Sequence, residues 1–233
     1  MPNCELAPRQ LTFRLPARVA LGRAAFFVAP ANGTAVAMID TWRIWPGDKL
    51  ALCGPAGSGK THLAHVWAAD SGARVVQAHD LPRADIPDLA SRPVAVEDVP
   101  AIAGQEEAER ALFHLHNLCL ANGGRLLVSG RDAPARWPLA LPDLASRLQA
   151  APVAKIEPPD DALLAAVLFK LFADRQLAVP DEVITYLVPR IDRSFATARE
   201  VVALLDDTAL RDRREITVPL ARAVLAELVN RAE

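Results

Sequence analysis

Apolar and polar residues along this 233-residue chain follow two alternating patterns, one typical of buried strands and one of amphipathic helices. Short apolar runs predict strands at residues 49–53, 73–77, 93–96 and 125–129. Between them, residues 61–69 and 106–121 contain no glycine or proline and have apolar residues at helical spacing. Strands that alternate with helices predict an α/β fold with a parallel, doubly wound sheet.

Two further segments carry local signals of their own. Asn32 is expected to cap a helix that has Ala35, Val36 and Ile39 along it. Residues 80–93 hold three prolines, so this segment is expected to be mostly loop with one short helix.

The pattern changes at residues 155–159, where the sequence Lys-Ile-Glu-Pro-Pro predicts a domain boundary. Beyond it only helices are expected, at residues 160–176, 181–190, 195–210 and 219–232, with Asp160, Asp181 and Thr217 near their starts as capping residues. We therefore expect three parts, which are an N-terminal tail at residues 1–20, an α/β nucleotide-binding domain at residues 21–157 and a small helical lid domain at residues 158–233.

The loop after the first strand has the sequence of a phosphate-binding loop. It matches the Walker A pattern G-x-x-x-x-G-K-[ST] in full, with Gly54, Pro55, Ala56, Gly57, Ser58, Gly59, Lys60 and Thr61. The glycines let backbone N–H groups surround a phosphate, while Lys60 reaches the β- and γ-phosphates and the Thr61 hydroxyl ligates Mg²⁺. A strand before this loop and a helix after it would hold the phosphate at a helix N-terminus. ATP or ADP with Mg²⁺ is the expected ligand.

Polar residues at two further strand ends predict the rest of this site. Glu97 and Asp98 end the third strand, where one carboxylate holds Mg²⁺ and a second orients the attacking water. Glu97 stands where Asp is usual, and its extra methylene argues against efficient intrinsic hydrolysis, because Mg²⁺ demands strict geometry. Ser129 ends the fourth strand, where a sensor hydroxyl would face the γ-phosphate; a simple turn at Ser129 is the alternative.

Composition narrows the class of protein. The net charge of −2 and the pI of about 6.2 give no global basic field, which argues against DNA binding as the main function. Three cysteines at unrelated spacings fit a reducing compartment. The chain has no apolar run that could cross a membrane and no signal peptide, so a cytoplasmic protein is expected.

The phosphate-binding loop, Glu97-Asp98 and the sequence Leu-Pro-Asp-Leu-Ala-Ser-Arg-Leu at residues 141–148 together resemble the AAA+ module of DnaA-type replication initiators. Residues 28–32 and 177–183 are similar to that family's adenine-side and lid segments. The resemblance runs from about residue 20 to the C-terminus, where such initiators continue into a DNA-binding domain. The chain looks most like the truncated, Hda-like branch of the family, in its alphaproteobacterial type.

This resemblance implies a regulator that inactivates DnaA and restrains re-initiation. Arg147 would be a trans arginine finger acting on ATP bound to DnaA, whereas spacing alone also allows an ordinary surface arginine. Asn32 would lie near the adenine. The tail would dock on the DNA sliding clamp, the β-subunit of DNA polymerase III, through Gln10, Leu11, Phe13 and Leu15. The protein would contact DNA only indirectly and would not bind a membrane. Formation of a homo-oligomer stays possible.

The chain departs from the family in three places. The family's lid arginine aligns with Ala196, and Arg199, one helical turn away, would take its place. The Asp-Arg pair after the fourth strand is reversed as Arg131-Asp132, and the third departure is Glu97. Together they favour a nucleotide-bound regulator with weak intrinsic ATPase activity. The alternatives are an autonomous P-loop ATPase acting as a helicase loader or chaperone, and a DNA-binding initiator fragment.

Overall fold

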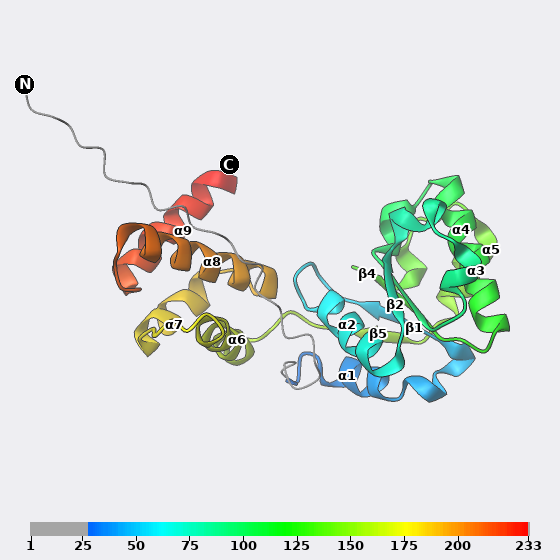
Figure 1. Cartoon of the computed structure of the whole chain (residues 1–233), viewed down its shortest axis with the longest axis horizontal. Helices are drawn as coiled ribbons and strands as arrows, with labels where there is room; N and C mark the ends of the chain where they lie inside the picture. The colour runs from blue at the N-terminus through cyan, green and yellow to red at the C-terminus, as the bar shows by residue number, and fades with distance from the viewer. Residues whose placement is uncertain (1–27, 233) are drawn as a thin grey trace, which may run out of the picture.

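The computed structural model describes residues 28–232 of the chain, and side chains as far as residue 228. The predicted tail at residues 1–20, with its clamp-binding motif, therefore lies outside the described residues. Figure 1 shows two bodies, a sheet covered by helices and a separate group of helices that ends at the C-terminus.

The sheet has five strands, which are β1 (Lys49–Cys53), β2 (Arg74–Gln77), β3 (Val94–Glu97), β4 (Leu126–Gly130) and β5 (Val153–Lys155). Their order is β2-β3-β4-β1-β5, and every neighbouring pair is parallel. The predicted parallel α/β sheet is thus confirmed. The sequence patterns missed β5, because only Ala154 of its three residues is buried and no apolar run marks the strand.

Both faces of the sheet are covered, which explains the unbroken apolar strands. Along β1, Leu50 and Leu52 face a core formed with α1 (Gly33–Asp40) and α2 (Lys60–Ser71). Ala51 and Cys53 face the opposite core, formed with α3 (Ile86–Leu89), α4 (Glu106–Ala121) and α5 (Pro142–Gln149). This alternation of side chains is the period of two expected of a strand that is buried on both faces.

Short 3₁₀ turns complete the sheet domain, namely η2 (Trp42–Ile44), η3 (Pro46–Asp48), η4 (Ala78–Arg83), η5 (Val99–Ile102) and η6 (Pro134–Arg136). The segment with three prolines was predicted as loop with one short helix, and it contains η4 and α3. Asn32 immediately precedes α1 but does not cap it with its side chain; its Oδ1 instead accepts a hydrogen bond from the Ala29 N–H at 2.9 Å.

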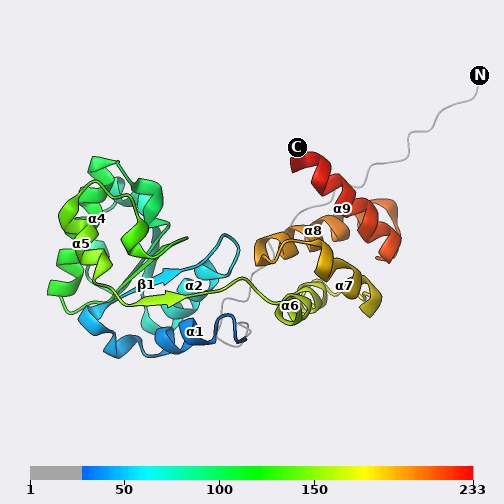
Figure 2. The same ribbon diagram turned by 180° about the vertical axis from the view of Figure 1, so that it is seen from behind.

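The second body consists of helices α6 (Asp161–Ala173), α7 (Asp181–Leu187), α8 (Phe195–Asp212) and α9 (Val218–Ala232), with the 3₁₀ turn η7 (Val188–Arg190) after α7. Figure 2 shows the strand-to-helix connection that leads from β5 into α6. Leu168, Phe172, Val201 and Leu205 lie in a core of their own, separate from the two cores of the sheet. These helices therefore form an independently packed lid.

The predicted lid caps were right in one case and wrong in another. The Asp160 carboxylate accepts a hydrogen bond from the Leu163 N–H at 2.8 Å and caps α6. Asp181 is the first residue of α7 rather than its cap, which is Pro180. Thr217 immediately precedes α9, and its carbonyl accepts a hydrogen bond from the Ala221 N–H at 2.9 Å.

Candidate nucleotide site

The predicted phosphate-binding loop joins β1 to α2 at the carboxyl edge of the sheet. Gly57 and Gly59 have φ angles of +70° and +102°, which L side chains rarely adopt. A Cβ atom at Gly54 would lie 2.5 Å from the carbonyl oxygen of Ile156, so only glycine fits there. The loop can therefore turn its backbone inward above the N-terminus of α2, the geometry that binds phosphate.

Lys60 lies at the first position of α2, with its side chain turned back over the loop. Its ammonium group donates hydrogen bonds to the carbonyls of Gly54 at 2.7 Å and Pro55 at 2.8 Å. Burial lowers the pKa of Lys60, Asp98 and Glu97 act to raise it, and Arg131 acts to lower it further. The loop, the two predicted carboxylates and Arg131 thus share one electrostatic environment.

Glu97 and Asp98 differ in their surroundings. Glu97 is only 4% exposed, and its Oε2 accepts a hydrogen bond from Gln77 Nε2 at 3.0 Å, while its Oε1 is buried without a hydrogen-bond partner. A buried carboxylate oxygen of this kind suits a divalent cation, which prefers oxygen ligands. Asp98 has a left-handed φ of +54°, and its N–H donates to the Ser129 Oγ at 3.2 Å. Ser129 therefore joins the ends of β3 and β4 beside the loop.

Arg131, which follows the last residue of β4, also lies at this edge. The Gly54 N–H donates to the carbonyls of Gly130 at 3.3 Å and Arg131 at 3.1 Å, which fixes the loop to the end of β4. Asp132 forms an exposed ion pair with Arg136 at 3.6 Å. Of the reversed pair, Arg131 is thus the member whose charge acts on Lys60, while Asp132 pairs locally.

The lid contacts the loop directly through the start of α8. The Phe195 N–H donates a 2.8 Å hydrogen bond to the Gly57 carbonyl. Ser194 caps α8 by accepting from the N–H groups of Ala196 and Thr197, and its Oγ would lie only 2.0 Å from a Cβ atom at Gly57. Ala196 also lies against this loop, with its Cβ 3.2 Å from the same point. The lid and the loop are therefore in van der Waals contact.

Arg199 of α8 acts electrostatically on the helix that follows the phosphate-binding loop. Its positive charge contributes to lowering the pKa of His62, the residue after Thr61, although burial of the imidazole is the larger cause. Ala196 offers no polar atom on its side chain at the loop itself. Arg199 is therefore the basic residue of α8 whose charge reaches α2 beside Thr61.

The segment before α1 is bonded to the connection that leads into the lid. Asn32 is 2% exposed, and the neighbouring Ala31 carbonyl accepts a hydrogen bond from the Glu157 N–H at 2.9 Å. This bond ties the segment to the connection between β5 and α6. Asn32 is thus held near the point where sheet and lid meet.

Arg147 lies far from all of these groups. It is exposed in the last turn of α5, whose buried side chains are Leu144 and Leu148. Its carbonyl accepts a 2.7 Å hydrogen bond from Nζ of Lys49, the first residue of β1, whereas the loop follows the last residue, Cys53. Five residues of strand separate the two ends by about 13 Å. In Figure 1, α5 lies on the side of the sheet away from the lid.

Comparison with known proteins finds a family match for the lid and a shared fold for the chain. The sequence profile described as "Hda, lid domain" matches residues 161–225, which run from the start of α6 into α9. Domain III of the Thermotoga maritima replication initiation protein DnaA has the same fold: it is 21% identical, covers 87% of this chain and 94% of its own, and superposes with a TM-score of 0.74. Residues 161–225 thus match an Hda-type lid, and the chain has the fold of DnaA domain III.

Two other AAA+ structures show the same fold. A replication initiator DnaA bound to AMPPCP and single-stranded DNA is 18% identical, with 82% of this chain and 67% of that chain covered and a TM-score of 0.65. AMPPCP-bound DnaA from Aquifex aeolicus is 19% identical, with 78% and 64% covered and a TM-score of 0.64. The predicted α/β AAA+ module with a helical lid is therefore confirmed.

Sequence reasoning missed three contributors to the site of this AAA+ module. Ser194 and Phe195 touch the loop, and Gln77 orients Glu97. Ser194 has a local signal, because serine before a helix is a common cap. No local signal exists for Gln77, whose contact depends on the register between β2 and β3, in which Gln77 pairs with Glu97.

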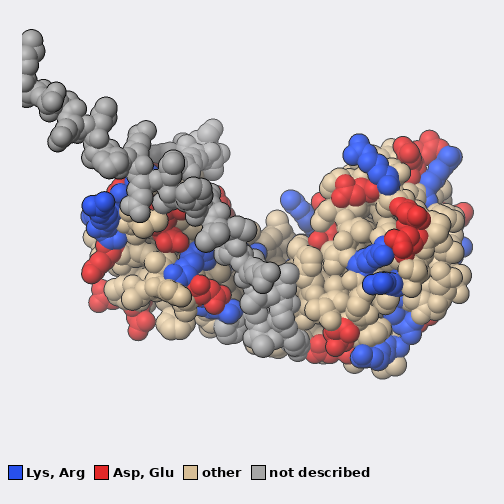
Figure 3. Space-filling view, viewed as in Figure 1, with Lys and Arg blue, Asp and Glu red and all other residues tan. Residues whose placement is uncertain are grey.

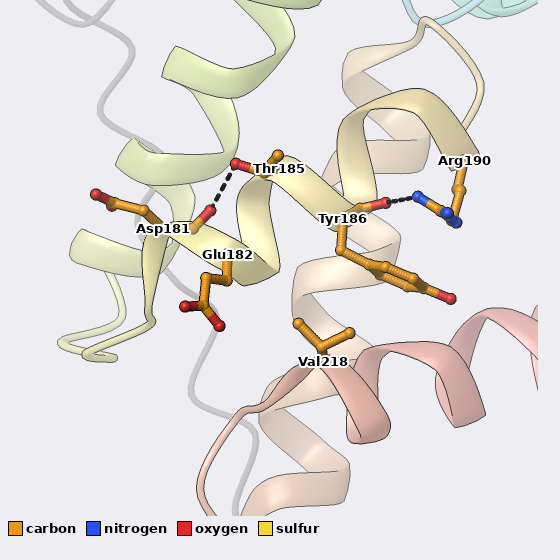
Figure 4. A pocket seen from close by; sticks show the side chains of 6 residues that line it. All are labelled: Asp181, Glu182, Thr185, Tyr186, Arg190 and Val218. Atoms are coloured by element: carbon orange, nitrogen blue, oxygen red, sulfur yellow. Dashed lines mark hydrogen bonds between the residues drawn. The ribbon is translucent and has the colours of Figure 1, made fainter.

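The lid of the AAA+ module also has an open pocket of about 450 Å³, lined by Asp181, Glu182, Thr185, Tyr186, Arg190 and Val218 (Figure 4). Arg190 donates to the Tyr186 carbonyl at 3.0 Å and stacks over the ring of the same residue. None of these residues belongs to the phosphate-binding loop or the strand ends. The pocket is therefore separate from the nucleotide site.

Proposed function

We propose that this chain is an adenine-nucleotide-binding AAA+ regulator of replication initiation, which promotes hydrolysis of ATP bound to the initiator DnaA. The observation that carries the proposal is the position of Arg147 at the opposite end of β1 from the chain's own loop. An arginine there cannot reach a nucleotide bound in cis, yet it is exposed and available to a neighbouring molecule. An arginine supplied in trans accelerates phosphoryl transfer by neutralising transition-state charge.

The chain's own nucleotide site has a binding role in this proposal. Residues 54–61 would hold the phosphates of ATP or ADP, Thr61 and Glu97 would ligate Mg²⁺, and Arg199 would approach from the lid. Mg²⁺ would neutralise phosphate charge when bound. The buried, unpartnered Oε1 of Glu97 and the glycine-only backbone at Gly54 support this assignment. The AMPPCP-bound DnaA structures of the same fold give it further support.

Three further assignments follow the Hda resemblance. The tail at residues 1–20 would dock on the DNA sliding clamp, residues 21–157 would bind the nucleotide and residues 158–233 would form the lid. DNA would be met through the clamp, and the protein would act in the cytoplasm. Negatively and positively charged side chains are interspersed on the face seen in Figure 3, as expected of a protein that does not rely on a basic DNA-binding face. No helix among residues 28–232 has the length and hydropathy that a membrane crossing requires.

The experiment measures hydrolysis of ATP by ATP-loaded DnaA in the presence of clamp loaded on DNA. Wild type should stimulate hydrolysis, and Arg147→Ala should reduce the stimulation by about 10³-fold, the contribution of a trans arginine. Arg136→Ala, which removes another exposed arginine of the same domain, is the control and should stimulate normally. Stimulation by Arg147→Ala at the wild-type rate would refute the assignment.

The docking assignment has a separate test, because residues 10–15 lie outside the described part of the chain. A triple change of Gln10, Leu11 and Phe13 to alanine should abolish binding to purified clamp and leave nucleotide binding unchanged. Clamp binding that survives these changes would exclude this motif as the docking element.

The second candidate function is an autonomous ATPase, and the position of Asp98 after β3, at the same sheet edge as the loop that carries Lys60, favours it. The Asp98 charge acts on the pKa of Lys60, so both a phosphate-binding cation and a carboxylate for a water are present. This function predicts steady ATP turnover by the purified chain without DnaA or clamp. The absence of such turnover, together with stimulation of DnaA, would leave the regulator as the function.

A further inference from the structure

The helix that carries Arg147 is held at both ends by buried charged side chains from other elements. Glu109 of α4 is 1% exposed, and its carboxylate accepts hydrogen bonds from the N–H groups of Ala140 at 3.0 Å and Leu141 at 2.6 Å, at the start of α5. Lys49 of β1 is 9% exposed and donates to the Arg147 carbonyl at the end of α5. A short helix of eight residues is thus fixed by two charge-assisted contacts.

The Lys49 contact is directed at the finger residue itself. The last four carbonyls of a helix have no partner within that helix, and the carbonyl of Arg147 is one of these. The Ala150 N–H bonds to the Ser146 carbonyl at 3.2 Å and the Ala151 N–H to the Leu148 carbonyl at 3.0 Å, which leaves the Arg147 carbonyl between them to Lys49. The backbone from which the guanidinium extends is therefore anchored to β1, at the start of that strand.

Lys49 is in turn oriented by His116 of α4. The two side-chain nitrogens, Nζ and Nε2, lie 3.4 Å apart, and His116 Nδ1 lies 3.2 Å from the Oδ1 of Asn117. A neutral imidazole that donates from Nδ1 to Asn117 and accepts from Lys49 at Nε2 gives both ring nitrogens of His116 a hydrogen-bond partner. Burial is the main cause that lowers the pKa of His116, which agrees with the neutral form.

The side chain of Arg147 then lies over the ring of Phe113, with its guanidinium carbon 5.2 Å from the ring centre. The exposed finger is thus supported from below by a ring and at its carbonyl by an ammonium group, both fixed by residues of the sheet domain. We propose that Lys49 is a positioning residue, which orients the last turn of α5 so that Arg147 reaches the partner's γ-phosphate. This proposal rests on the proposed function of Arg147.

The test compares Lys49→Met, Lys49→Arg and Arg147→Ala in the stimulation of ATP hydrolysis by clamp-dependent, ATP-loaded DnaA. Methionine keeps the length and the apolar stem of lysine but removes the donor. Because small misplacements of a catalytic group cost up to about 10²-fold in rate, Lys49→Met should lower the maximum stimulated rate by about 10-fold. The concentration that gives half-maximal stimulation should change less than about twofold, since the proposed docking surfaces are unaltered.

Lys49→Arg restores a buried donor of positive charge and should recover most of the maximum rate. Arg74→Met is the matched control, because Arg74 is also the first residue of a strand in this sheet but pairs with Asp88 of α3. Hydrogen exchange adds a structural readout, in which the amides of Ala150 and Ala151 should exchange faster in Lys49→Met than in wild type.

The outcomes separate the positioning role from the proposed function. Loss of stimulation in Arg147→Ala with a wild-type rate in Lys49→Met overturns the positioning role alone. Full stimulation by Arg147→Ala overturns the finger assignment and the role of Lys49 with it. A Lys49→Met variant whose half-maximal concentration rises, or a Lys49→Arg variant as slow as Lys49→Met, also contradicts positioning. If Lys49→Met does not fold, Glu109→Gln tests the other end of α5 and should lower the maximum rate several-fold.

Discussion

Replacing Gly57 with alanine should separate the lid from the phosphate-binding loop. Alanine at this position would have to adopt the left-handed backbone conformation of Gly57, which costs about 1–2 kcal/mol for a residue with a Cβ atom. The new Cβ would also lie 2.0 Å from the Oγ of Ser194 and 3.2 Å from the Cβ of Ala196, so the start of α8 must move away. That movement breaks the hydrogen bond from the Phe195 N–H to the Gly57 carbonyl, a loss of about 0.5–1.5 kcal/mol. The expected total cost is about 1.5–3.5 kcal/mol in the free energy of unfolding.

Gly72→Ala isolates the part of this cost that comes from the backbone alone. Gly72 has a φ of +69°, close to that of Gly57, and no described residue lies within 4 Å of an added Cβ. Gly72→Ala should therefore cost only the backbone part, about 1–2 kcal/mol. Urea unfolding followed by far-UV circular dichroism measures both values, provided that each transition is two-state.

A double-mutant cycle then tests the lid contact directly. Ser194→Gly removes the clashing hydroxyl and costs only a few tenths of a kcal/mol as a helix cap. Combined with Gly57→Ala, it should recover about 1 kcal/mol relative to the sum of the single changes. If Gly57→Ala costs no more than Gly72→Ala, or if the cycle is additive, the contact between lid and loop does not exist in solution.

Three other predictions concern groups outside this contact. In a Cys4→Ser variant, Cys53 and Cys119 should not react with a disulfide reagent at about pH 8, because burial raises both thiol pKa values from 9.0 to about 11. For the same reason, folding stability should fall as the pH rises from 9.0 to about 11. Rapid labelling of the native protein at about pH 8 would contradict this prediction. Glu97→Gln should remove the dependence of ADP affinity on Mg²⁺ in titration calorimetry, and an unchanged dependence would exclude Glu97 as a ligand. Phe172→Ala should cost about 3–5 kcal/mol in the lid core, seen as a shift of the unfolding transition followed by circular dichroism. The transition followed by tryptophan fluorescence should stay as in wild type, because all four tryptophans lie in the sheet domain. Equal shifts of both signals would contradict a separate lid core.

Local patterns predicted the elements that carry strong periodic or loop signals. The apolar run at Lys49–Cys53 and the helix at Glu106–Ala121 were predicted with the bounds that the structure has. Both depend on residues close together in the chain. The edge strand β5 was missed, since it is short and its partner β1 lies about a hundred residues away in the sequence.

In the candidate site, too, the local features could be predicted from the sequence and the contacts between distant residues could not. The glycine-rich loop is a local feature, and its backbone angles follow from its own residues. The contacts that complete it come from elsewhere in the fold: Gln77 reaches Glu97 through strand register, and the start of α8 reaches Gly57 through the packing of the lid. Asn32 illustrates a competing local choice, because its side chain bonds backward to Ala29 and not forward into α1. Such choices depend on small differences that sequence patterns do not resolve.

The most direct test of the account determines where ATP is hydrolysed. DnaA is loaded with γ-labelled ATP and this chain with unlabelled ADP, and release of labelled phosphate is followed with clamp loaded on DNA in a single turnover. The account predicts fast release with wild type and release at the basal DnaA rate with Arg147→Ala. Release at the basal rate with wild type, or equally fast release with both proteins, would contradict a finger supplied in trans by Arg147.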